Sequence, residues 1–362
     1  MAPKGGPADD LLELTAELVA VPSVSRDEAR LAGFVESELR RSAHLEVERI
    51  GDSVVARSQL GRPARVLLAG HLDTVPGSAN ASARVDGDAV TGLGAVDMKG
   101  GLAVMLHLAP LLEAAAVDVT FVFYACEEIE RTANALAALA RDRPELLAAD
   151  AAVLGEPTAG VVEAGCQGTM RAEITVTGRR AHTARPYTGV NAVHRLAAVL
   201  PVLQGYRSRQ VEIDGCEYAE QLQAVRVSGG VATNVVPDEA TLTVNYRFAP
   251  DRSSPEAEQE LRRMFEPALD AGRGDRLTVV DEAAGATPGL THPLLAKLVA
   301  ASGRAPRAKV GWTDVATLAA IGIPATNFGP GDPMLAHTAD ERVTRGELEH
   351  VHGVLSALLG VG

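Results

Sequence analysis

Aromatic, cysteine and basic residues are all scarce in this chain of 362 residues. Aromatic residues make up 3% of the sequence, so the core must be built mainly from Ala, Val and Leu, and a stacking platform for single-stranded nucleic acid is not expected. Acidic residues outnumber basic ones by 47 to 34, which gives a net charge of −13. A field of that sign repels nucleic acid and anionic membranes, so we expect neither as a partner.

The three cysteines, Cys126, Cys166 and Cys216, are odd in number, far apart and outside any CxxC pair. This pattern argues against a disulfide framework and favours a reducing compartment. The first ten residues lack the apolar stretch of a signal peptide, and no apolar run reaches the roughly 18 residues that span a bilayer. We therefore expect a cytoplasmic protein whose residues 1–8 form a loose tail.

Apolar runs alternate with helix-length segments through the first half of the chain. We predict buried strands at ARVLLAG (64–70), VDVTFVFYAC (117–126) and AAVLGEP (151–157), and helices at residues 11–21, 27–41, 98–115 and 132–149. This alternation predicts an α/β fold with a mostly parallel sheet and helices on both faces. Ligands of such sheets gather at the carboxyl ends of the strands.

The pattern changes near residue 169 to the order β-α-β-β-α-β, which is typical of a ferredoxin-like domain. The predicted segments are strands at 169–178, 222–233, 240–249 and 276–283, with helices at 191–203 and 254–272. After them the chain returns to α/β, with helices at 291–302 and 344–359 around a strand at 323–328. We predict a catalytic domain formed by residues 1–168 and 284–362, and an inserted domain formed by residues 169–283.

Histidine and acidic residues follow several of the strand-like runs, and one more histidine lies near the C-terminus. They are His71 and Asp73 in GHLDTVP, Asp97 in GLGAVDMKGG, Glu127 and Glu128 in FVFYACEEIE, Glu156 in VLGEPTAG, and His337 in GPGDPMLAHTADERV. Imidazoles and carboxylates are the ligand types that hold a pair of zinc ions and leave a position open for water. The set therefore predicts metal-assisted hydrolysis.

Local geometry suggests how these residues divide the work. On an extended segment His71 and Asp73 face the same side. The carboxylate of Asp73 can then accept a hydrogen bond from one imidazole nitrogen of His71 while the other nitrogen binds metal. Of the adjacent Glu127 and Glu128, one can bind metal while the other acts as general base. Each feature also has an ordinary interpretation: Asp97 as a helix N-cap, the two glutamates as an acidic first turn, and Glu156 as a loop residue.

At these residues the chain resembles the dinuclear zinc deacylases and carboxypeptidases of the aminoacylase-like metallopeptidase group. GHLDTVP, DMKGG, the Glu-Glu pair, GEPT, RRAHTARP, TNVVPD, NYR, WTD and FGPGD with its following histidine occur in the order of that group, over nearly the whole chain. The resemblance implies two bound Zn²⁺, for which Co²⁺ can substitute. It assigns His71, Asp97 and Glu156 to one ion and Asp97, Glu128 and His337 to the other, with Asp97 bridging.

The same resemblance implies the remaining roles. Asp73 is expected to orient His71, and Glu127 to act as the general base. His182 is expected to cross a homodimer formed through the inserted domain and to stabilise the oxyanion in the partner's site. Asn234, Arg247 and Thr313 resemble substrate-binding residues. A guanidinium such as that of Arg247 suits a carboxylate, because it can bind both oxygens.

The expected substrate is a small acylated amino acid, and the first candidate is N-succinyl-LL-diaminopimelate, cleaved to succinate and LL-diaminopimelate. Two elements depart from many relatives: GCQGT (165–169) replaces an Arg-Arg-Gly element, and GWTD (311–314) replaces Gly-Thr-Ser-Asp. Both would line the substrate pocket, so acetylornithine, other acyl amino acids and dipeptides stay open as substrates. The alternative class is a non-catalytic binding protein with this fold. A nucleotide-binding protein is set aside because the sequence lacks a phosphate loop.

Overall fold

The computed structural model of the protein describes residues 10–77 and 82–361. The tail expected at residues 1–8 lies outside these ranges. Within them the central sheet has eight strands in the order β1-β2-β6-β3-β7-β18-β8-β17. The strands are β1 (Leu45–Ile50), β2 (Ser53–Ser58), β3 (Arg65–His71), β6 (Asp118–Tyr124), β7 (Ala151–Leu154), β8 (Glu163–Ala164), β17 (Arg307–Ala308) and β18 (Ala325–Asn327).

The centre of this sheet is parallel. β6, β3, β7 and β18 run in the same direction as one another, and β17 is parallel to β8. The β1–β2 hairpin, its pairing with β6, and the β18–β8 pair are antiparallel. The predicted mostly parallel sheet is therefore confirmed, whereas the β1–β2 hairpin at one edge was not predicted.

Alternate side chains of the central strands face two separate cores, which is why these strands read as continuous apolar runs. In β3, Val66 and Leu68 face one core, while Leu67 and Ala69 face the other. The first core is covered by α1 (Leu11–Ala20), α2 (Ala29–Leu39), α3 (Gly100–Leu108), α9 (Pro293–Ser302) and α11 (Arg345–Leu359). The second is covered by α4 (Ala135–Asp142), α5 (Pro144–Leu147) and α10 (Val315–Ala320).

The helix α3 is extended on both sides by irregular turns, η1 (Ala95–Lys99) before it and η2 (Ala109–Ala114) after it. Among the described helices this combined segment, Ala95–Ala114, is the one long and apolar enough by composition to cross a membrane. That differs from our expectation that no run reaches this length. In its apolar window of 18 residues, however, 78% is buried within the protein, so the segment is a helix of the core.

A second sheet is formed by the described residues between Gly168 and Ala283. Its four antiparallel strands have the order β13-β15-β9-β16. They are β9 (Gly168–Thr177), β13 (Gln221–Gly229), β15 (Glu239–Phe248) and β16 (Arg276–Ala283). The helices α6 (Ala192–Arg195), α7 (Leu200–Gly205) and α8 (Ser254–Phe265) accompany the sheet, and α6 and α8 share one apolar core with it. The predicted β-α-β-β-α-β order is confirmed.

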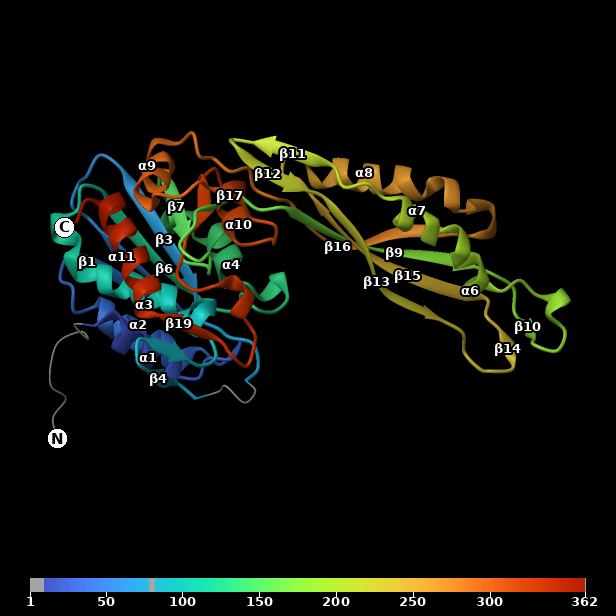
Figure 1. The fold of residues 1–362 in the computed structure, drawn as a ribbon, viewed down its shortest axis with the longest axis horizontal. Helices are drawn as coiled ribbons and strands as arrows, with labels where there is room; N and C mark the ends of the chain where they lie inside the picture. The colour runs from blue at the N-terminus through green and yellow to red at the C-terminus, as the bar shows by residue number, and fades with distance from the viewer. Residues whose placement is uncertain (1–9, 78–81, 362) are drawn as a thin grey trace.

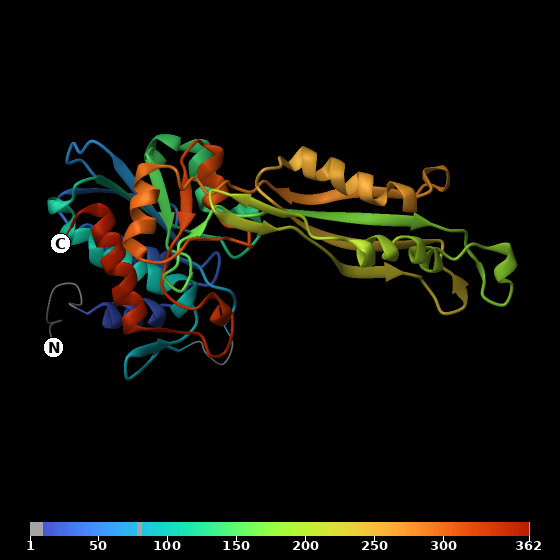
Figure 2. The ribbon, with the colours of Figure 1, turned by 45° about the horizontal axis from the view of Figure 1, so that its top comes forward.

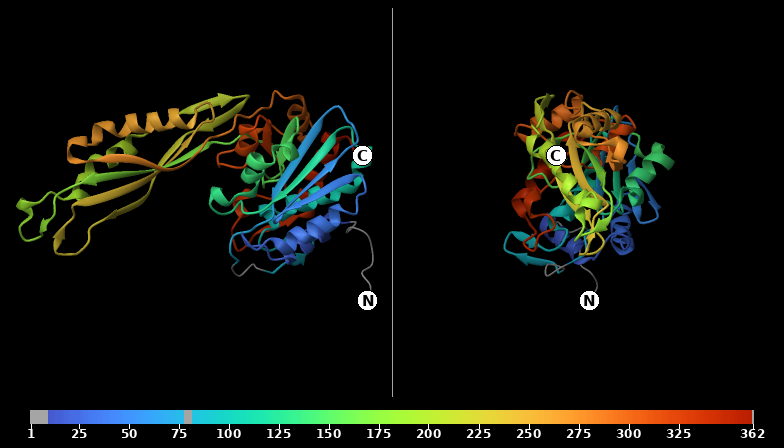
Figure 3. Two further views of the ribbon diagram at one scale, coloured as in Figure 1. Left: turned by 180° about the vertical axis from the view of Figure 1, so that it is seen from behind. Right: turned by 90° about the vertical axis from the view of Figure 1, so that its right-hand side faces the viewer.

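Two small sheets in this region were not predicted. One is the hairpin β11 (Gln210–Ile213) and β12 (Cys216–Ala219), which packs Tyr218 against the central-sheet part of the chain. The other pairs β10 (Ala181–His182) with β14 (Val235–Val236). Figure 1 shows the second sheet projecting from the central one, with β10 and β14 at its far end, and Figures 2 and 3 show the same arrangement from other sides.

Three short strands form the remaining sheet, which lies beside the turn that carries Asp97. They are β4 (Arg84–Asp86), β5 (Ala89–Thr91) and β19 (Arg342–Thr344), in the order β19-β5-β4. Because β5 leads into the Asp97 turn and β19 follows the loop that carries His337, this sheet brings two distant segments of the chain together.

Candidate metal centre

The parallel strands bring the predicted ligands to one edge of the central sheet. His71 is the last residue of β3, Glu127 and Glu128 follow β6, and Glu156 follows β7. The register pairs His71 with Tyr124 at the end of β6, so the carboxyl ends of these strands lie level. The predicted ligands therefore lie at the carboxyl ends of parallel strands, where ligands of such sheets are expected.

Among the described residues, two groups could each hold a metal ion. The first is His71, Asp97 and Glu156, and the second is Asp97, Glu128 and His337. Within each group the potential ligand atoms all lie within 4.8 Å of one another. These are the two sets that the sequence resemblance implied, and Asp97 belongs to both.

The two oxygens of Asp97 face different histidines. Its Oδ1 lies 3.0 Å from Nε2 of His71, and its Oδ2 lies 3.5 Å from Nε2 of His337. Nε2 of His337 also lies 2.8 Å from Oε1 of Glu128. Oε1 of Glu156 is buried and has no hydrogen-bond partner among the described residues. A buried carboxylate oxygen without a donor fits a site for a cation, so the donor set and its geometry suit divalent metal.

The electrostatics of the cluster favour added positive charge. Burial raises the pKa of Glu156 to about 7, and the charge of Asp97 adds to the shift. Burial also raises the pKa of Glu127 well above its ordinary value, with repulsion from Glu156 and Asp314 adding to it. Burial opposes the ionisation of Asp97 too, but hydrogen bonds from His337 and His71 hold its pKa below the usual range. Divalent cations would relieve the repulsion among these carboxylates.

Asp73 contacts both the segment that follows β6 and His71. Its two oxygens accept hydrogen bonds from the backbone N–H groups of Glu127, at 2.9 Å, and Glu128, at 3.0 Å, and from the hydroxyl of Ser25, at 2.7 Å. Nδ1 of His71 lies 3.0 Å from the backbone carbonyl of Asp73 but 3.5 Å from its carboxylate. Burial opposes its charge, but the contact with His71 and these donors lower the pKa of Asp73 to about 2.

The two adjacent glutamates have different surroundings. Glu128 belongs to a ligand group and Glu127 belongs to neither of the two. Glu127 is partly buried beside the cluster, and its backbone is fixed by Asp73. This division leaves Glu127 available as a base. The adjacent positions in the sequence do not by themselves distinguish the ligand from the base.

The predicted substrate residues lie at three different places. Arg247 is half-buried in β15, paired in register with Thr169 where the second sheet leaves the central one. Thr313 is buried, and its hydroxyl donates to Oδ1 of Asn327 at 3.0 Å. Asn234 and His182 are exposed near or on β14 and β10, at the far end of the second sheet (Figure 1). Within one chain, the fold does not bring these last two residues to the metal-ligand groups.

Two buried acids near the cluster were not assigned a role from the sequence. Asp314 is fully buried and accepts hydrogen bonds from Asn134 and Thr317, both at 2.7 Å. Glu341 is 1% exposed and accepts from the backbone of the Asp97 turn. Both occur inside the motifs GWTD and HTADERV. Thr317 is close to Asp314 in the sequence, but Asn134 and the Asp97 turn lie far from these two acids, so the local pattern does not show what the acids hold in place.

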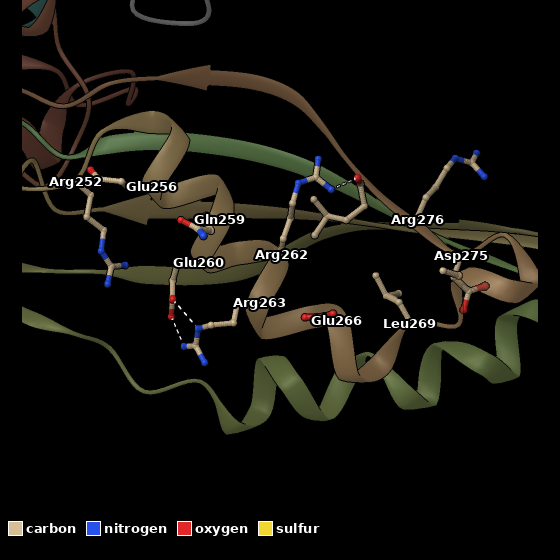
Figure 4. Close-up of a pocket in the computed structure, with 12 residues that line it drawn as sticks. Arg252, Glu256, Gln259, Glu260, Arg262, Arg263, Glu266, Leu269, Asp275 and Arg276 are labelled. Atoms are coloured by element: carbon tan, nitrogen blue, oxygen red, sulfur yellow. Dashed lines mark hydrogen bonds and ion pairs between the residues drawn. The ribbon is translucent and has the colours of Figure 1, made fainter.

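A groove lies elsewhere, along α8, which packs on the second sheet. It has a volume of about 710 Å³ and is shown in Figure 4. Charged side chains line it, and several of them pair with one another: Arg263 with Glu260, and Arg262 with Glu258 and the carbonyl of Leu277. None of the predicted site residues lines this groove.

The strand-end cluster and the surrounding fold define a class of metal-dependent hydrolase, and comparison with known proteins agrees. The sequence matches Peptidase family M20/M25/M40 over residues 67–360. The chain therefore belongs to this family, and it is a metal-dependent enzyme that hydrolyses amide bonds. The family resemblance predicted from the motifs is confirmed.

Individual relatives cover nearly all of the chain. A putative succinyl-diaminopimelate desuccinylase of Mycobacterium tuberculosis is 54% identical over 352 residues, 97% of this chain and 98% of the relative. A succinyl-diaminopimelate desuccinylase of Corynebacterium glutamicum is 43% identical over 356 residues, 97% of this chain and 96% of the relative.

Solved structures share the fold at lower identity. The aminopeptidase PepT of Bacillus cereus has a TM-score of 0.79 at 18% identity and covers 97% of each chain. A metallo-carboxypeptidase of Sulfolobus solfataricus has a TM-score of 0.75 at 15% identity and covers 98% of this chain and 99% of its own.

Proposed function

We propose that this protein hydrolyses N-succinyl-LL-diaminopimelate to succinate and LL-diaminopimelate, a step that supplies lysine biosynthesis. The observation that carries the reaction type is the pair of ligand groups sharing Asp97, with Glu127 beside them. The substrate is supported by the two relatives with that printed activity, at 54% and 43% identity over nearly the full length.

The proposed cofactors are two Zn²⁺, with Co²⁺ able to substitute. His71, Asp97 and Glu156 would hold one ion, and Asp97, Glu128 and His337 the other. When bound, such ions lower the pKa of water and polarise the amide carbonyl.

In the proposed reaction Glu127 takes a proton from the attacking water. The water oxygen forms a bond to the amide carbon, and the tetrahedral oxyanion then collapses with loss of the C–N bond. Glu127 returns the proton to the leaving amine, which departs as LL-diaminopimelate. The pKa of Glu127 is raised well above its ordinary value, mainly by burial, and this makes its carboxylate a stronger proton acceptor.

Substrate binding is proposed for Arg247, Asn234 and Thr313. The guanidinium of Arg247 has a polar contact with Asn245, at 3.2 Å, and no carboxylate partner among the described residues. It is therefore available for a substrate carboxylate, and succinyl-diaminopimelate carries three of them. Thr313 would act through its backbone, because its hydroxyl is engaged with Asn327.

We further propose a cytoplasmic homodimer that associates through an inserted domain of residues 169–283, which also acts as a lid. The exposed position of His182 on β10, distant from its own metal cluster, supports a role in the partner's site, where it would stabilise the oxyanion. All three cysteines lie in described residues and are free, as suits a reducing compartment.

A substrate panel tests the proposal. The purified protein is loaded with Zn²⁺ and assayed with succinyl-diaminopimelate, acetylornithine and dipeptides, then treated with a chelator and reloaded. We expect turnover of succinyl-diaminopimelate above the others, loss on chelation and recovery on reloading. Preference for another compound would refute the substrate, and no metal binding together with no turnover would favour a non-catalytic protein.

A further inference from the structure

Glu341 makes hydrogen bonds to the turn that carries Asp97. Its Oε1 accepts from the backbone N–H of Val96 at 3.0 Å and from that of Asp97 at 3.1 Å. Its own backbone carbonyl accepts from the N–H of Gly92 at 3.0 Å. Three hydrogen bonds thus join this residue to a turn that lies about 245 positions earlier in the sequence.

The position of Glu341 is costly for an acid. It is 1% exposed, and its Oε2 is buried without a hydrogen-bond partner among the described residues. Lys99, itself 2% exposed, is close enough for its charge to interact favourably with that of Glu341, and its ammonium donates to the carbonyl of Val21 at 2.7 Å. A buried carboxylate is tolerated where its hydrogen bonds fix a structure. Here the fixed structure is a ligand-bearing turn.

The other side of the connection leads to His337. The loop from His337 to Glu341 is short, and β19 begins directly after it at Arg342. β19 pairs with β5, which runs into the Asp97 turn. The carboxylate of Glu341 is therefore a side-chain link between two segments that each supply a ligand to the same group, Asp97 and His337.

We propose that Glu341 is a positioning residue, which sets the placement of Asp97 relative to His337 through the backbone of the Asp97 turn. The inference rests on the proposed metal-dependent function and deepens it. His71 and Glu156 are held by the ends of β3 and β7, whereas His337 lies on a loop. Loss of Glu341 should therefore weaken the group containing His337 more than the group containing Glu156.

The test is a zinc titration of the full-length protein in competition with a chromogenic chelator, for wild type, E341A and E341Q. The wild type should bind two equivalents. E341A should bind one equivalent with near-wild-type affinity and the second about 10- to 100-fold more weakly. Losses of that size are usual when a residue that holds a metal ligand in place is removed. E341Q should stay close to wild type, because its amide oxygen can accept from both N–H groups.

Two further measurements separate positioning from a general loss of structure. The visible spectrum of the Co²⁺-loaded protein should change for E341A and not for E341Q, because it reports ligand geometry. D340A removes the neighbouring acid, which is exposed, and should bind both ions as the wild type does. If E341A fails to fold, E341D, whose shorter side chain cannot reach both N–H groups, should show the selective loss instead.

The outcomes distinguish this inference from the function on which it rests. Unchanged affinities and spectrum in E341A, or in E341D where E341A does not fold, would overturn the role of Glu341 and leave the hydrolase proposal intact. Equal weakening by D340A and E341A would also overturn it, since a charge effect would then suffice. A wild-type chain that binds no zinc would refute the proposed function itself.

Discussion

At the scale of single residues, the proposed chemistry depends on the difference between Glu127 and Glu128. Glu128 belongs to a ligand group, and Glu127 does not. We therefore predict that E127Q keeps its metal and lowers kcat by about 10²- to 10⁴-fold, because an amide cannot accept the proton from water. The measurements are turnover of succinyl-diaminopimelate and bound zinc by elemental analysis.

The matched control is E130Q, the same substitution in the same loop. Glu130 is exposed and pairs with Arg26 at the surface, so this variant should turn over like the wild type. Near-normal turnover by E127Q would show that Glu127 is not the general base. Loss of zinc by E127Q would instead show that Glu127 is a ligand.

The ligands themselves could be predicted from sequence because each follows a strand-like run or lies within a recognisable motif. Asp314 and Glu341 could not, although both are buried near the same cluster. Their hydrogen-bond partners, such as Asn134 and the backbone of Asp97, lie far away in the sequence. Local pattern indicates which residues can do chemistry, and only the fold shows which residues hold them in place.

At the scale of elements, strands were predicted better than the limits of helices. The strand predicted at 276–283 has the same bounds as β16. A Gly-rich turn precedes it, and apolar and polar residues alternate clearly along it. The helix predicted over 191–203 is divided into α6, a 3₁₀ turn and α7, and the helix over 132–149 is divided before Pro144. Apolar periodicity persists through such breaks, so it does not reveal them.

The packing of α3 against α11 provides a pH-dependent contact that is separate from the metal cluster. Nδ1 of His107 in α3 lies 3.0 Å from Nε2 of His352 in α11. Burial and the neighbouring His107 lower the pKa of His352 from 6.5 to about 4. A histidine with a lowered folded-state pKa contributes stability above pH 6.5 that is lost as the pH falls toward 4, because the unfolded chain takes up the proton first.

We predict that H352Q reduces the slope of Tm against pH between 6.5 and 4, compared with the wild type. The measurement is thermal unfolding by circular dichroism across this range, with a chelator present so that metal release does not contribute. H350Q, on the same helix, is the control and should keep the wild-type slope. Identical slopes for wild type and H352Q would contradict the assignment of this contact as a source of pH dependence.

At the scale of the whole molecule, the second sheet separates two parts of the predicted site. The metal-ligand groups lie at an edge of the central sheet, and His182 lies on β10 at the opposite end of the second sheet (Figures 1 and 3). A residue so placed can reach a metal cluster only on another subunit or after a large movement of the lid. The proposed homodimer favours the first of these routes.

Mixing two inactive variants distinguishes the routes. H182A lacks the proposed oxyanion donor and E127Q lacks the base, so each alone should be nearly inactive. If His182 acts in the partner's site, a mixed dimer holds one complete site, formed by Glu127 of the H182A subunit and His182 of the E127Q subunit. With random exchange, about one quarter of all sites should be complete, and activity should recover to that fraction.

The readout is kcat after the two proteins are unfolded together and refolded with zinc, with each variant treated alone as the control. H194A changes another exposed histidine, on the helix α6 that packs on the second sheet, and should be active by itself. No recovery in a mixture that forms dimers by light scattering would place His182 in its own subunit's site and require lid movement. Full activity of H182A alone would show that His182 takes no part in catalysis, because removing an oxyanion donor lowers kcat strongly. Removing an exposed side chain that does not contact the substrate leaves kcat unchanged.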